Sequence, residues 1–296
     1  MLLNKGKGVP MGKDKRQPTK TAHISAQLLT ILVPLVIVAI SIVAITLSIQ
    51  AKSVIEREAK SGLKEETRAN ATGIAQIADS IKLYYDGIAD VIEQTNFESD
   101  AQIESILANS MKSYEGKVSD VYIGLSNMDF IDGAHWTPDP GYDPTTRAWY
   151  QNGVTNSTVT LGPPSLDLTT NSMVSCGSRS ITLKDGRTGA LSIDVLLAGL
   201  SELVSSYKPG ITGGSLCLDN TMILGSLDTS YVGTDVSEHP DDVLLQGIST
   251  FVSSGDISEV QILPGNNGKN YYVAFYPVDG TKWTLVSYVK TADVLA

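Results

Sequence analysis

The chain has 296 residues, which is enough for about two domains of ordinary size. Hydrophobic residues make up 42% of it and charged residues 18%, a composition that buries a core and excludes a disordered chain. The two cysteines and three histidines are too few for a disulfide framework or a metal centre built from several of them, and we expect no cofactor.

The formal net charge of −10 is unevenly distributed along the chain. The first 25 residues carry six basic side chains and one acidic one, so they sum to +5 and the remainder to −15. An acidic body repels phosphate backbones, and we therefore expect no nucleic-acid partner.

A membrane-spanning helix is predicted over residues 24–50. No Asp, Glu, Lys or Arg occurs between Thr21 and Ala51, and residues 28–47 are almost continuously apolar. A span needs about 20 such residues, because ~1.5 Å per residue must cover ~30 Å of hydrocarbon. The stretch is longer than the apolar core of a secretory signal, and no small-x-small cleavage site follows it, which favours an uncleaved anchor over a cleaved signal.

The charges around the span predict its orientation. Six lysines and arginines precede it and five lie in residues 51–70, so the difference is small. The short basic leader, residues 1–23, fits the cytoplasmic side, and the acidic remainder after about residue 51 is expected outside the cytoplasm. The expected location is the cell membrane.

A long stalk helix is predicted over residues 51–95. Apolar side chains recur there at spacings of mostly three and four, and no proline interrupts the pattern. The stripe is weakest between Leu63 and Ala71, with Thr67 at the midpoint. Three glycines lower the helix propensity, so packing must hold the helix together. The alternative is two helices joined near Gly73.

The pattern then changes to alternating helices and strands, which predicts a module over residues 96–208. A helix is expected at 100–113, capped by Asp100, and another at 196–207. A long loop is expected at 132–144, and Asp185-Gly186 predicts a hairpin turn. Strands are expected at 121–125, 130–131, 158–161, 173–178 and 190–195.

Residues 209–296 repeat this plan on a smaller scale, after a boundary at Lys208-Pro209-Gly210. A helix is expected at 241–251. Strands are expected at 215–218, 222–224, 260–263, 271–278 and 283–289. Two successive α+β modules with antiparallel sheets follow from this pattern. Cys176 and Cys217 fall in different modules and are expected to be buried thiols, with a disulfide as the alternative.

The densest group of functional side chains lies in residues 142–150, which we expect to form a loop. Arg147 offers a planar set of donors that suits a carboxylate held by two parallel hydrogen bonds. Tyr142, Trp149 and Tyr150 can form the walls of a small pocket, and their ring faces attract an ammonium group.

Asp167 and Asp194 are acids at positions where apolar strands are expected, and such carboxylates cost stability unless they have a partner. An arginine and an acid among aromatic rings would fit a zwitterion, with the carboxylate at Arg147 and the ammonium at Asp194. The alternative is that Arg147 and Asp194 form a structural ion pair and that the aromatic residues belong to the core.

The run Tyr-Asp-Pro-x-x-Arg-x-Trp-Tyr, after a membrane anchor and a long helix, resembles the double Cache (dCache) sensor domain of bacterial methyl-accepting chemotaxis receptors and related sensor kinases, of the amino-acid-binding kind. The resemblance covers nearly everything from about residue 50 to 296. It implies an α+β fold with two tandem PAS-like modules, a membrane-distal module that holds the ligand, and a homodimer.

The resemblance also implies roles for individual residues. Arg147 and Trp149 would bind the ligand carboxylate, and Asp194 would bind its amine with help from tyrosines. Asp167 matches an acid that often lines the pocket, and Tyr122 lies on the strand that usually contributes an aromatic wall. The implied site residues are Tyr122, Tyr142, Arg147, Trp149, Tyr150, Asp167 and Asp194.

Two positions depart from the family pattern. Pro163-Pro164-Ser165 stands where Glu-Pro-Tyr is common, so one tyrosine is missing, and Ala148 replaces a common proline. Ser165 would leave a larger or more polar pocket, which bears on the side-chain preference of the ligand more than on its zwitterionic part. Such receptors usually continue into a second span and a cytoplasmic output domain. Two alternatives stay open: the sequence is truncated before these segments, or the protein is an anchored sensor without an output domain of its own.

Other classes of function remain as alternatives. A sensor region of a histidine kinase, or one for a non-amino-acid ligand, would share these features. An anchored hydrolase would need a nucleophile–base pair or two carboxylates across a cleft, for which Asp167 and Asp194 are the only candidates; no Gly-x-Ser-x-Gly motif occurs and no histidine lies in a motif. An anchored structural surface module is the third alternative. We expect a small-molecule binding protein and not an enzyme.

Overall fold

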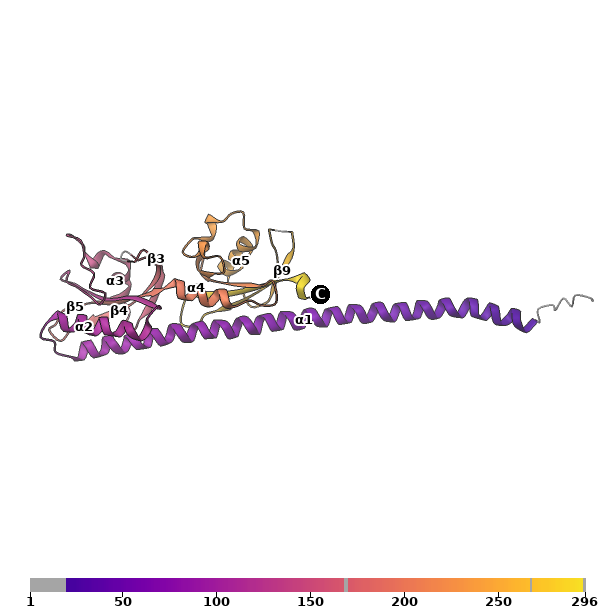
Figure 1. Ribbon diagram of the computed structural model, residues 1–296, viewed down its shortest axis with the longest axis horizontal. Helices are drawn as coiled ribbons and strands as arrows, with labels where there is room; N and C mark the ends of the chain where they lie inside the picture. The colour runs from indigo at the N-terminus through magenta and orange to yellow at the C-terminus, as the bar shows by residue number, and fades with distance from the viewer. Residues whose placement is uncertain (1–19, 168–169, 267, 295–296) are drawn as a thin grey trace, which may run out of the picture. The chain divides into compact units, whose positions relative to one another are not determined.

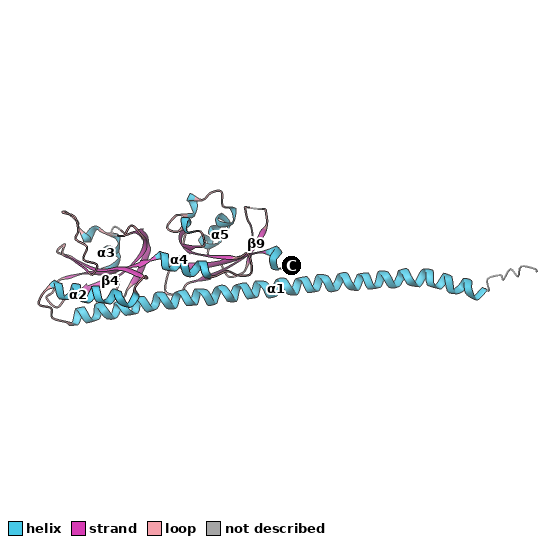
Figure 2. Ribbon diagram, viewed as in Figure 1, coloured by secondary structure: helices cyan, strands magenta, loops and turns pink. Residues whose placement is uncertain are grey.

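The computed structural model describes residues 20–167, 170–266 and 268–294, so most of the predicted basic leader, residues 1–23, lies outside the described residues. The chain separates into two compact units, Met1–Val54 and Ile55–Ala296. The fold is α+β, with helices and two antiparallel sheets in the second unit, as the sequence predicts (Figure 2).

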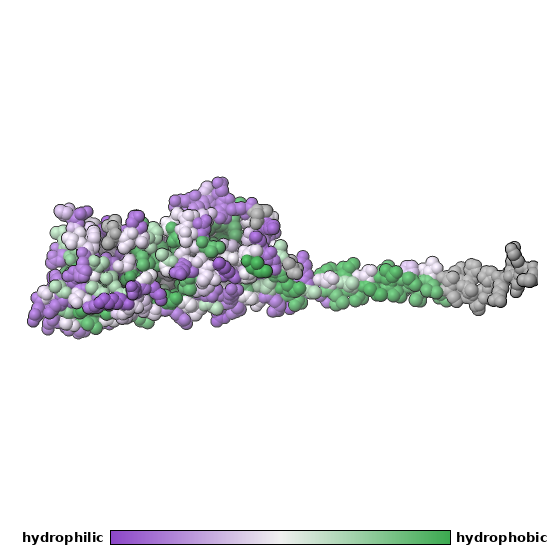
Figure 3. All heavy atoms as spheres, in the orientation of Figure 1, coloured by the Kyte–Doolittle hydropathy of each residue, from purple (hydrophilic) through white to green (hydrophobic). Residues whose placement is uncertain are grey.

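The first helix, α1 (Lys20–Gln94), is continuous for 75 residues. The alternative of two helices joined near Gly73 is therefore wrong. Pro34 lies inside the helix, in a segment whose large apolar side chains are exposed from Leu28 to Ile49. Figure 3 shows this segment as a nearly unbroken hydrophobic surface. By length and composition it is able to cross a membrane.

The later part of α1, from Ile55 onward, packs against one face of each sheet (Figure 1). Ile81, Tyr85 and Ile92 pack on the first sheet, and Leu63 packs on the second. Thr67, in the weak part of the apolar stripe, is fully buried, and its hydroxyl donates to the Leu63 carbonyl at 2.6 Å. That hydrogen bond satisfies the only polar group of the side chain, so the stripe continues through this position.

The distal module forms one five-stranded antiparallel sheet in the order β2-β1-β5-β4-β3. Its strands are β1 (Val118–Leu125), β2 (Phe130–Asp132), β3 (Thr160–Leu166), β4 (Met173–Thr182) and β5 (Thr188–Leu196). Its helices are α2 (Asp100–Met111), η1 (Lys112–Tyr114), η2 (Pro144–Thr146) and α3 (Ala148–Gly153). The expectation that residues 142–150 form a loop is wrong, because they contain η2 and the start of α3.

The proximal module repeats the topology, with its sheet in the order β7-β6-β10-β9-β8. Relative to the first strand of each module, this is the same order as in the distal sheet, which supports the repeated plan read from the sequence. Its strands are β6 (Gly214–Asp219), β7 (Met222–Ser226), β8 (Gln261–Pro264), β9 (Asn270–Pro277) and β10 (Trp283–Lys290). Its helices are η3 (Thr229–Tyr231), η4 (Val236–Glu238), α5 (Val243–Ser254) and α6 (Thr291–Val294). The helix α4 (Leu197–Ser206) precedes the predicted boundary at 208–210, and its Leu197 and Val204 side chains pack on the sheet of the proximal module.

The pleat of the distal sheet separates two sets of side chains. Val121 and Ile123 of β1 and Ile193 of β5 belong to the core that includes α1. The residues between them, Tyr122 and Asp194 among others, point to the opposite face, because successive side chains of a strand alternate. The candidate site therefore lies on the face of the sheet away from α1.

Arg179 of β4 ties the α1 face of the sheet to the helix. Its guanidinium donates to Asp90 at 2.9 Å, to Glu93 at 3.3 Å and to Asp86 at 3.4 Å, all on α1. Arg179, Asp86 and Glu93 are largely buried, so the contacts of Arg179 with these two acids form in a partly desolvated environment and are stronger than surface ion pairs, whereas the Asp90 side chain is 66% exposed.

Candidate functional site

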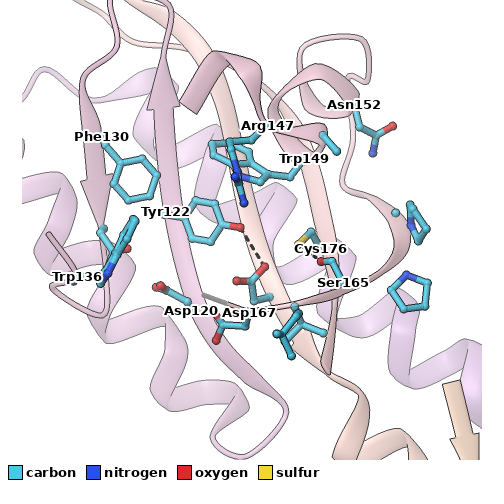
Figure 4. A pocket seen from close by; sticks show the side chains of 18 of the residues that line it. Asp120, Tyr122, Phe130, Trp136, Arg147, Trp149, Asn152, Ser165, Asp167 and Cys176 are labelled. Atoms are coloured by element: carbon cyan, nitrogen blue, oxygen red, sulfur yellow. Dashed lines mark hydrogen bonds between the residues drawn. The ribbon is translucent and has the colours of Figure 1, made fainter. Parts of the chain in front are cut away.

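A cavity of about 510 Å³ lies on the open face of the distal sheet, beside η2 and α3 (Figure 4). It collects side chains from all five strands of that sheet and from the segment between β2 and β3. Six of the seven residues singled out in the sequence line it: Tyr122, Tyr142, Arg147, Trp149, Asp167 and Asp194.

Tyr150 is the exception. It is buried, and its ring centroid lies 5.8 Å from that of Trp149, but it does not line the cavity. Its place is behind the tryptophan, where it supports the wall. A direct contact between Tyr150 and a ligand remains a prediction.

The local sequence explains how the segment before α3 is held. The Asp143 carboxylate accepts hydrogen bonds from the backbone N–H of Thr145 at 2.9 Å and from its hydroxyl at 2.6 Å, which caps η2. Pro144 follows at the first helical position, where a missing N–H costs nothing, and it is buried. Arg147 is extended (φ −80°, ψ 143°) between η2 and α3. Asp143 and Pro144 are thus structural parts of the motif.

Gly124 of β1 lets this segment approach the sheet. A Cβ atom at this position would lie 2.6 Å from the Cη2 atom of Trp149 and 2.8 Å from the Cβ atom of Pro144. Both distances are shorter than any real contact of a side-chain carbon allows. The absence of a side chain at Gly124 therefore sets the position of Trp149 in the cavity wall.

Aromatic rings form one side of the cavity. The Tyr122 ring lies edge to face with Trp149, with centroids 4.9 Å apart, and 5.4 Å from Phe130. Trp136 and Tyr142 complete the set, with centroids 5.3 Å apart. Phe130 and Trp136 were not singled out in the sequence. Such rings offer apolar area to a ligand stem and negative faces to a cation.

Arg147 is exposed at the mouth of the cavity, with its guanidinium carbon 5.9 Å from the centroid of the Tyr142 ring. Among the described residues it forms no ion pair, so the alternative of a structural bridge between Arg147 and Asp194 is not what the structure contains. A guanidinium in this state has its donors available for a ligand carboxylate.

Asp194 lies on β5 and is 5% exposed. The hydroxyl of Tyr122 donates to its Oδ1 atom at 3.0 Å, drawn as a dashed line in Figure 4. Burial raises the pKa of Asp194 to about 6, which the hydrogen bonds from Cys176 and Tyr122 partly oppose and the charges of Asp167 and Asp132 reinforce. The carboxylate is ionised at neutral pH and has no cation beside it among the described residues. It is therefore suited to bind an ammonium group.

Asp167 does not occupy the apolar strand that the sequence led us to expect. It follows β3 directly, and its carboxylate accepts hydrogen bonds from the backbone N–H of Thr170, at 3.2 Å, and from the hydroxyl of the same residue. It is buried and lines the cavity while its carboxylate also holds Thr170. The hydrogen bonds explain how a carboxylate is held there.

Ser165 stands where the family commonly has a tyrosine, and it lies beside Cys176. The Ser165 hydroxyl lies 3.6 Å from the sulfur of Cys176, and both residues line the cavity. Cys176 and Cys217 are free thiols, so the alternative of a disulfide between them is wrong. Burial raises the pKa of the Cys176 thiol, which stays protonated near neutral pH.

Two further acids, Asp120 and Asp132, line the cavity and were not identified from the sequence. Asp120 is 4% exposed and Asp132 is 5% exposed. Both could have been identified from their spacing in the sequence, because Asp120 lies two positions before Tyr122 and Asp132 lies two positions after Phe130. A period of two places each acid on the same face as its aromatic neighbour.

No group of three or more His, Cys, Asp or Glu side chains in the described part of the chain is placed to hold a metal ion. The site so defined is a cavity with one exposed arginine, four buried acids and an aromatic wall. These are groups for binding a small charged molecule.

Comparison with known proteins finds relatives of this chain by sequence and by fold. Residues 51–296 match the family model dCache_1, described as a Cache domain. The methyl-accepting chemotaxis protein McpG of Pseudomonas putida is 24% identical over 279 residues, which cover 88% of this chain. The chain spans 39% of the length of that curated relative.

Solved ligand-binding domains share the fold. That of the Pseudomonas fluorescens chemoreceptor CtaA, in complex with L-isoleucine, is 20% identical with a TM-score of 0.66, covering 83% of this chain and 98% of its own. That of the Pseudomonas aeruginosa PAO1 chemoreceptor PctC, in complex with GABA, is 21% identical with a TM-score of 0.63, covering 78% and 99%. The sensory domain of the Campylobacter jejuni chemoreceptor Tlp3, with isoleucine bound, is 15% identical with a TM-score of 0.64, covering 83% and 98%.

Proposed function

This chain belongs to the Cache domain family, and we propose on that premise that it is the extracytoplasmic sensor region of a transmembrane chemoreceptor. Its distal module binds a small amino-acid-like ligand, and its N-terminal helix anchors it in the membrane. The observation that carries the proposal is one cavity that holds a buried carboxylate at Asp194 and an exposed Arg147, which forms no ion pair with any residue that the structure describes.

The ligand chemistry follows from these two groups. Arg147 binds the ligand carboxylate through parallel hydrogen bonds, a geometry that the planar guanidinium favours. Asp194 binds the ammonium group, with the Tyr122 hydroxyl holding the carboxylate in place at 3.0 Å. Trp149 and Tyr142 form the wall between them. The cavity of about 510 Å³ lies within the range of small-molecule sites.

The comparisons support the ligand class by analogy. The solved relatives are chemoreceptor domains in complex with isoleucine or GABA, each of which carries one carboxylate and one amine. The departures at Ser165 and Ala148 concern the rest of the ligand, because neither residue bears a charge that a zwitterion requires.

Signalling requires that the ligand bind two arrangements of the distal module with different affinities, because a ligand shifts a conformational equilibrium only by that difference. The shift passes along α1, the helix on which both sheets pack. The expected partners are the membrane and a second copy of the chain. The site binds and does not catalyse a reaction.

Titration of the full chain in detergent with the twenty amino acids, by isothermal calorimetry, tests the proposal. Arg147→Ala is expected to weaken the best ligand at least tenfold, because hydrogen bonds to a charged group contribute about 1.5–3 kcal/mol. The matched control is Arg57→Ala, since Arg57 is an exposed arginine on α1, far from the cavity in sequence and absent from its lining. An Arg147→Ala protein that binds the ligand as tightly as the control would overturn the assignment.

A further inference from the structure

Three carboxylates lie in a row across neighbouring strands of the distal sheet. Asp120 of β1 is paired in register with Asp194 of β5, and Tyr122 of β1 with Asp132 of β2. Because β2, β1 and β5 are adjacent, the three acids share one face of the sheet and line one cavity. Residues paired in register have Cα atoms ~4.5–5.5 Å apart, so the row extends over two strand spacings.

One end of this row is short of hydrogen-bond donors. The Oδ1 atom of Asp132 accepts from the backbone N–H of Trp136 at 3.1 Å, while its Oδ2 atom is buried and receives no donor among the described residues. The side chain of Asp120 accepts one hydrogen bond, from the backbone N–H of Val121 at 2.7 Å. A buried acceptor without a donor is costly, so a group that donates to it is stabilised there.

The charges around these two acids do not neutralise them. Asp194 and Asp167 add negative charge from β5 and from the end of β3. Arg147 lines the same cavity, and His135, whose Nδ1 atom contacts Glu104 at 2.6 Å, acts to lower the pKa of Asp132 but does not outweigh the effect of burial. Four acids thus line the cavity together with one arginine. A zwitterion bound between Arg147 and Asp194 brings no net charge and leaves this excess in place.

We propose that Asp120 and Asp132 form a subsite for a second cationic group, so that the ligand is an α-amino acid with a positively charged side chain. The inference rests on the proposed function, in which Arg147 and Asp194 hold the α-carboxylate and the α-ammonium. It assigns Asp120, on the middle strand, and Asp132, at the far end of the row from Asp194, to the side chain of the ligand.

The dimensions fit such a ligand. Neighbouring strands are ~4.8 Å apart, so the centres of the two subsites lie about 5–10 Å from each other. The two nitrogens of lysine are separated by six bonds of about 1.5 Å, which extend to about 7.5 Å. One bound lysine therefore reaches from Asp194 to the acidic pair without distortion of the sheet.

Aromatic rings stand next to the acidic pair. The Phe130 centroid lies 5.7 Å from that of Trp136 and 5.5 Å from that of Tyr142, and all three rings line the cavity. Ring faces attract ammonium and guanidinium groups, and the rings also cover the methylene stem of a long basic side chain. Figure 4 shows Phe130 and Trp136 on the same side of the cavity as Asp120.

Without a ligand, a proton takes the place of the missing cation. Burial and the Asp132 charge raise the pKa of Asp120, and burial raises that of Asp132. A protonated Asp120 can donate to the Oδ2 atom of Asp132, which satisfies that oxygen. The second ammonium group of the ligand displaces this proton and donates in its stead.

Lysine and norleucine test the subsite, because they differ mainly by the terminal ammonium group. Both are titrated into the full chain in detergent at pH 7, along with the Asp132→Asn and Asp120→Asn variants. Asp139→Asn is the matched control, since Asp139 is an exposed acid between β2 and η2 that does not line the cavity. We expect lysine to bind at least about tenfold more tightly than norleucine, the gain of a charge-assisted hydrogen bond. The preference should largely disappear in Asp132→Asn and persist in Asp139→Asn.

Proton release gives a readout that needs no variant. Calorimetry in two buffers of different ionisation enthalpy should detect more protons released by lysine than by norleucine. Equal affinity for the two ligands, or a lysine preference that Asp132→Asn and Asp120→Asn both leave unchanged, overturns the subsite. If both ligands bind equally and Arg147→Ala abolishes both, the proposed function stands and the subsite fails.

The opposite failure is also distinct. If pentane-1,5-diamine binds and needs Asp132 while neither amino acid binds, the acidic subsite stands and the role of Arg147 in the proposed function fails. If none of the three compounds binds, the subsite fails, and the titration with the twenty amino acids decides the proposed function.

Discussion

Replacing Asp194 by asparagine tests the ammonium site with little change of shape. The amide keeps the volume of the side chain and one oxygen that accepts from the Tyr122 hydroxyl, which lies 3.0 Å from the carboxylate. What is lost is the negative charge. Because Asp194 is 5% exposed, solvent does not screen that charge, and its loss should be felt in full by a bound ammonium group.

The expected loss follows from this burial. A hydrogen bond to a charged group contributes about 1.5–3 kcal/mol, so the affinity for a ligand with a free α-amine should fall about 10- to 150-fold. A ligand that lacks the amine does not use the charge, and its affinity should change little. Calorimetry with an amino acid and its desamino analogue measures both numbers on the same protein.

The pH profile provides a second measurement. Burial raises the pKa of Asp194 to about 6, and the ammonium group binds the ionised form. For an amino acid without a charged side chain, the affinity of the wild-type chain should therefore be constant above about pH 7 and roughly tenfold weaker at pH 5, where about one tenth of the Asp194 carboxylates are ionised. The Asp194→Asn profile should lack this step. Equal losses for both ligands, or a wild-type affinity that is flat down to pH 5, would refute the ammonium role.

Three further substitutions test other parts of the structure. Gly124→Ala should weaken ligand binding at least tenfold and cost about 1–3 kcal/mol of stability, because the added carbon would lie 2.6 Å from Trp149; unchanged affinity would contradict this. Arg179→Ala should lower the free energy of urea unfolding by about 2–4 kcal/mol, since it leaves the largely buried Asp86 carboxylate on α1 without a cation; a loss below about 0.5 kcal/mol would contradict it. The raised pKa of Asp120, to about 8, stabilises the fold below the usual aspartate range, and this contribution is lost as pH rises through about 8. The melting temperature of the unliganded chain should therefore fall between pH 6 and pH 9, and Asp120→Asn should reduce that fall.

The sequence predicted the elements whose patterns are locally determined. Hairpins such as the one at Asp185-Gly186, where Gly186 has φ 91°, have turn residues that suit their backbone. The long helix was predicted from its apolar spacing, and packing on both sheets accounts for its continuity through Gly73. Helix α3 was missed because it has only six residues and no apolar repeat of its own.

The site was predicted in part for a related reason. Residues 142–150 are adjacent in the sequence, and Asp194 was conspicuous because it interrupts an apolar strand. Asp120 and Asp132 lie immediately outside the predicted strands 121–125 and 130–131, where an acid is unremarkable. Their proximity depends on the order β2-β1-β5, which is a tertiary property that no local pattern contains.

The two faces of the distal sheet suggest how a bound ligand is sensed. On β1, Tyr122 faces the cavity while Val121 and Ile123 pack toward α1. A shift of that strand would therefore change both the cavity lining and the packing against α1. On β4, Cys176 lines the cavity and Arg179, three residues later, holds α1 through Asp90. Packed cores do not deform continuously, which favours two discrete arrangements over a gradual one. The strands that carry the proposed ligand-binding residues are thus the same strands that pack against the helix, so the proposed signal needs no element between the sheet and α1.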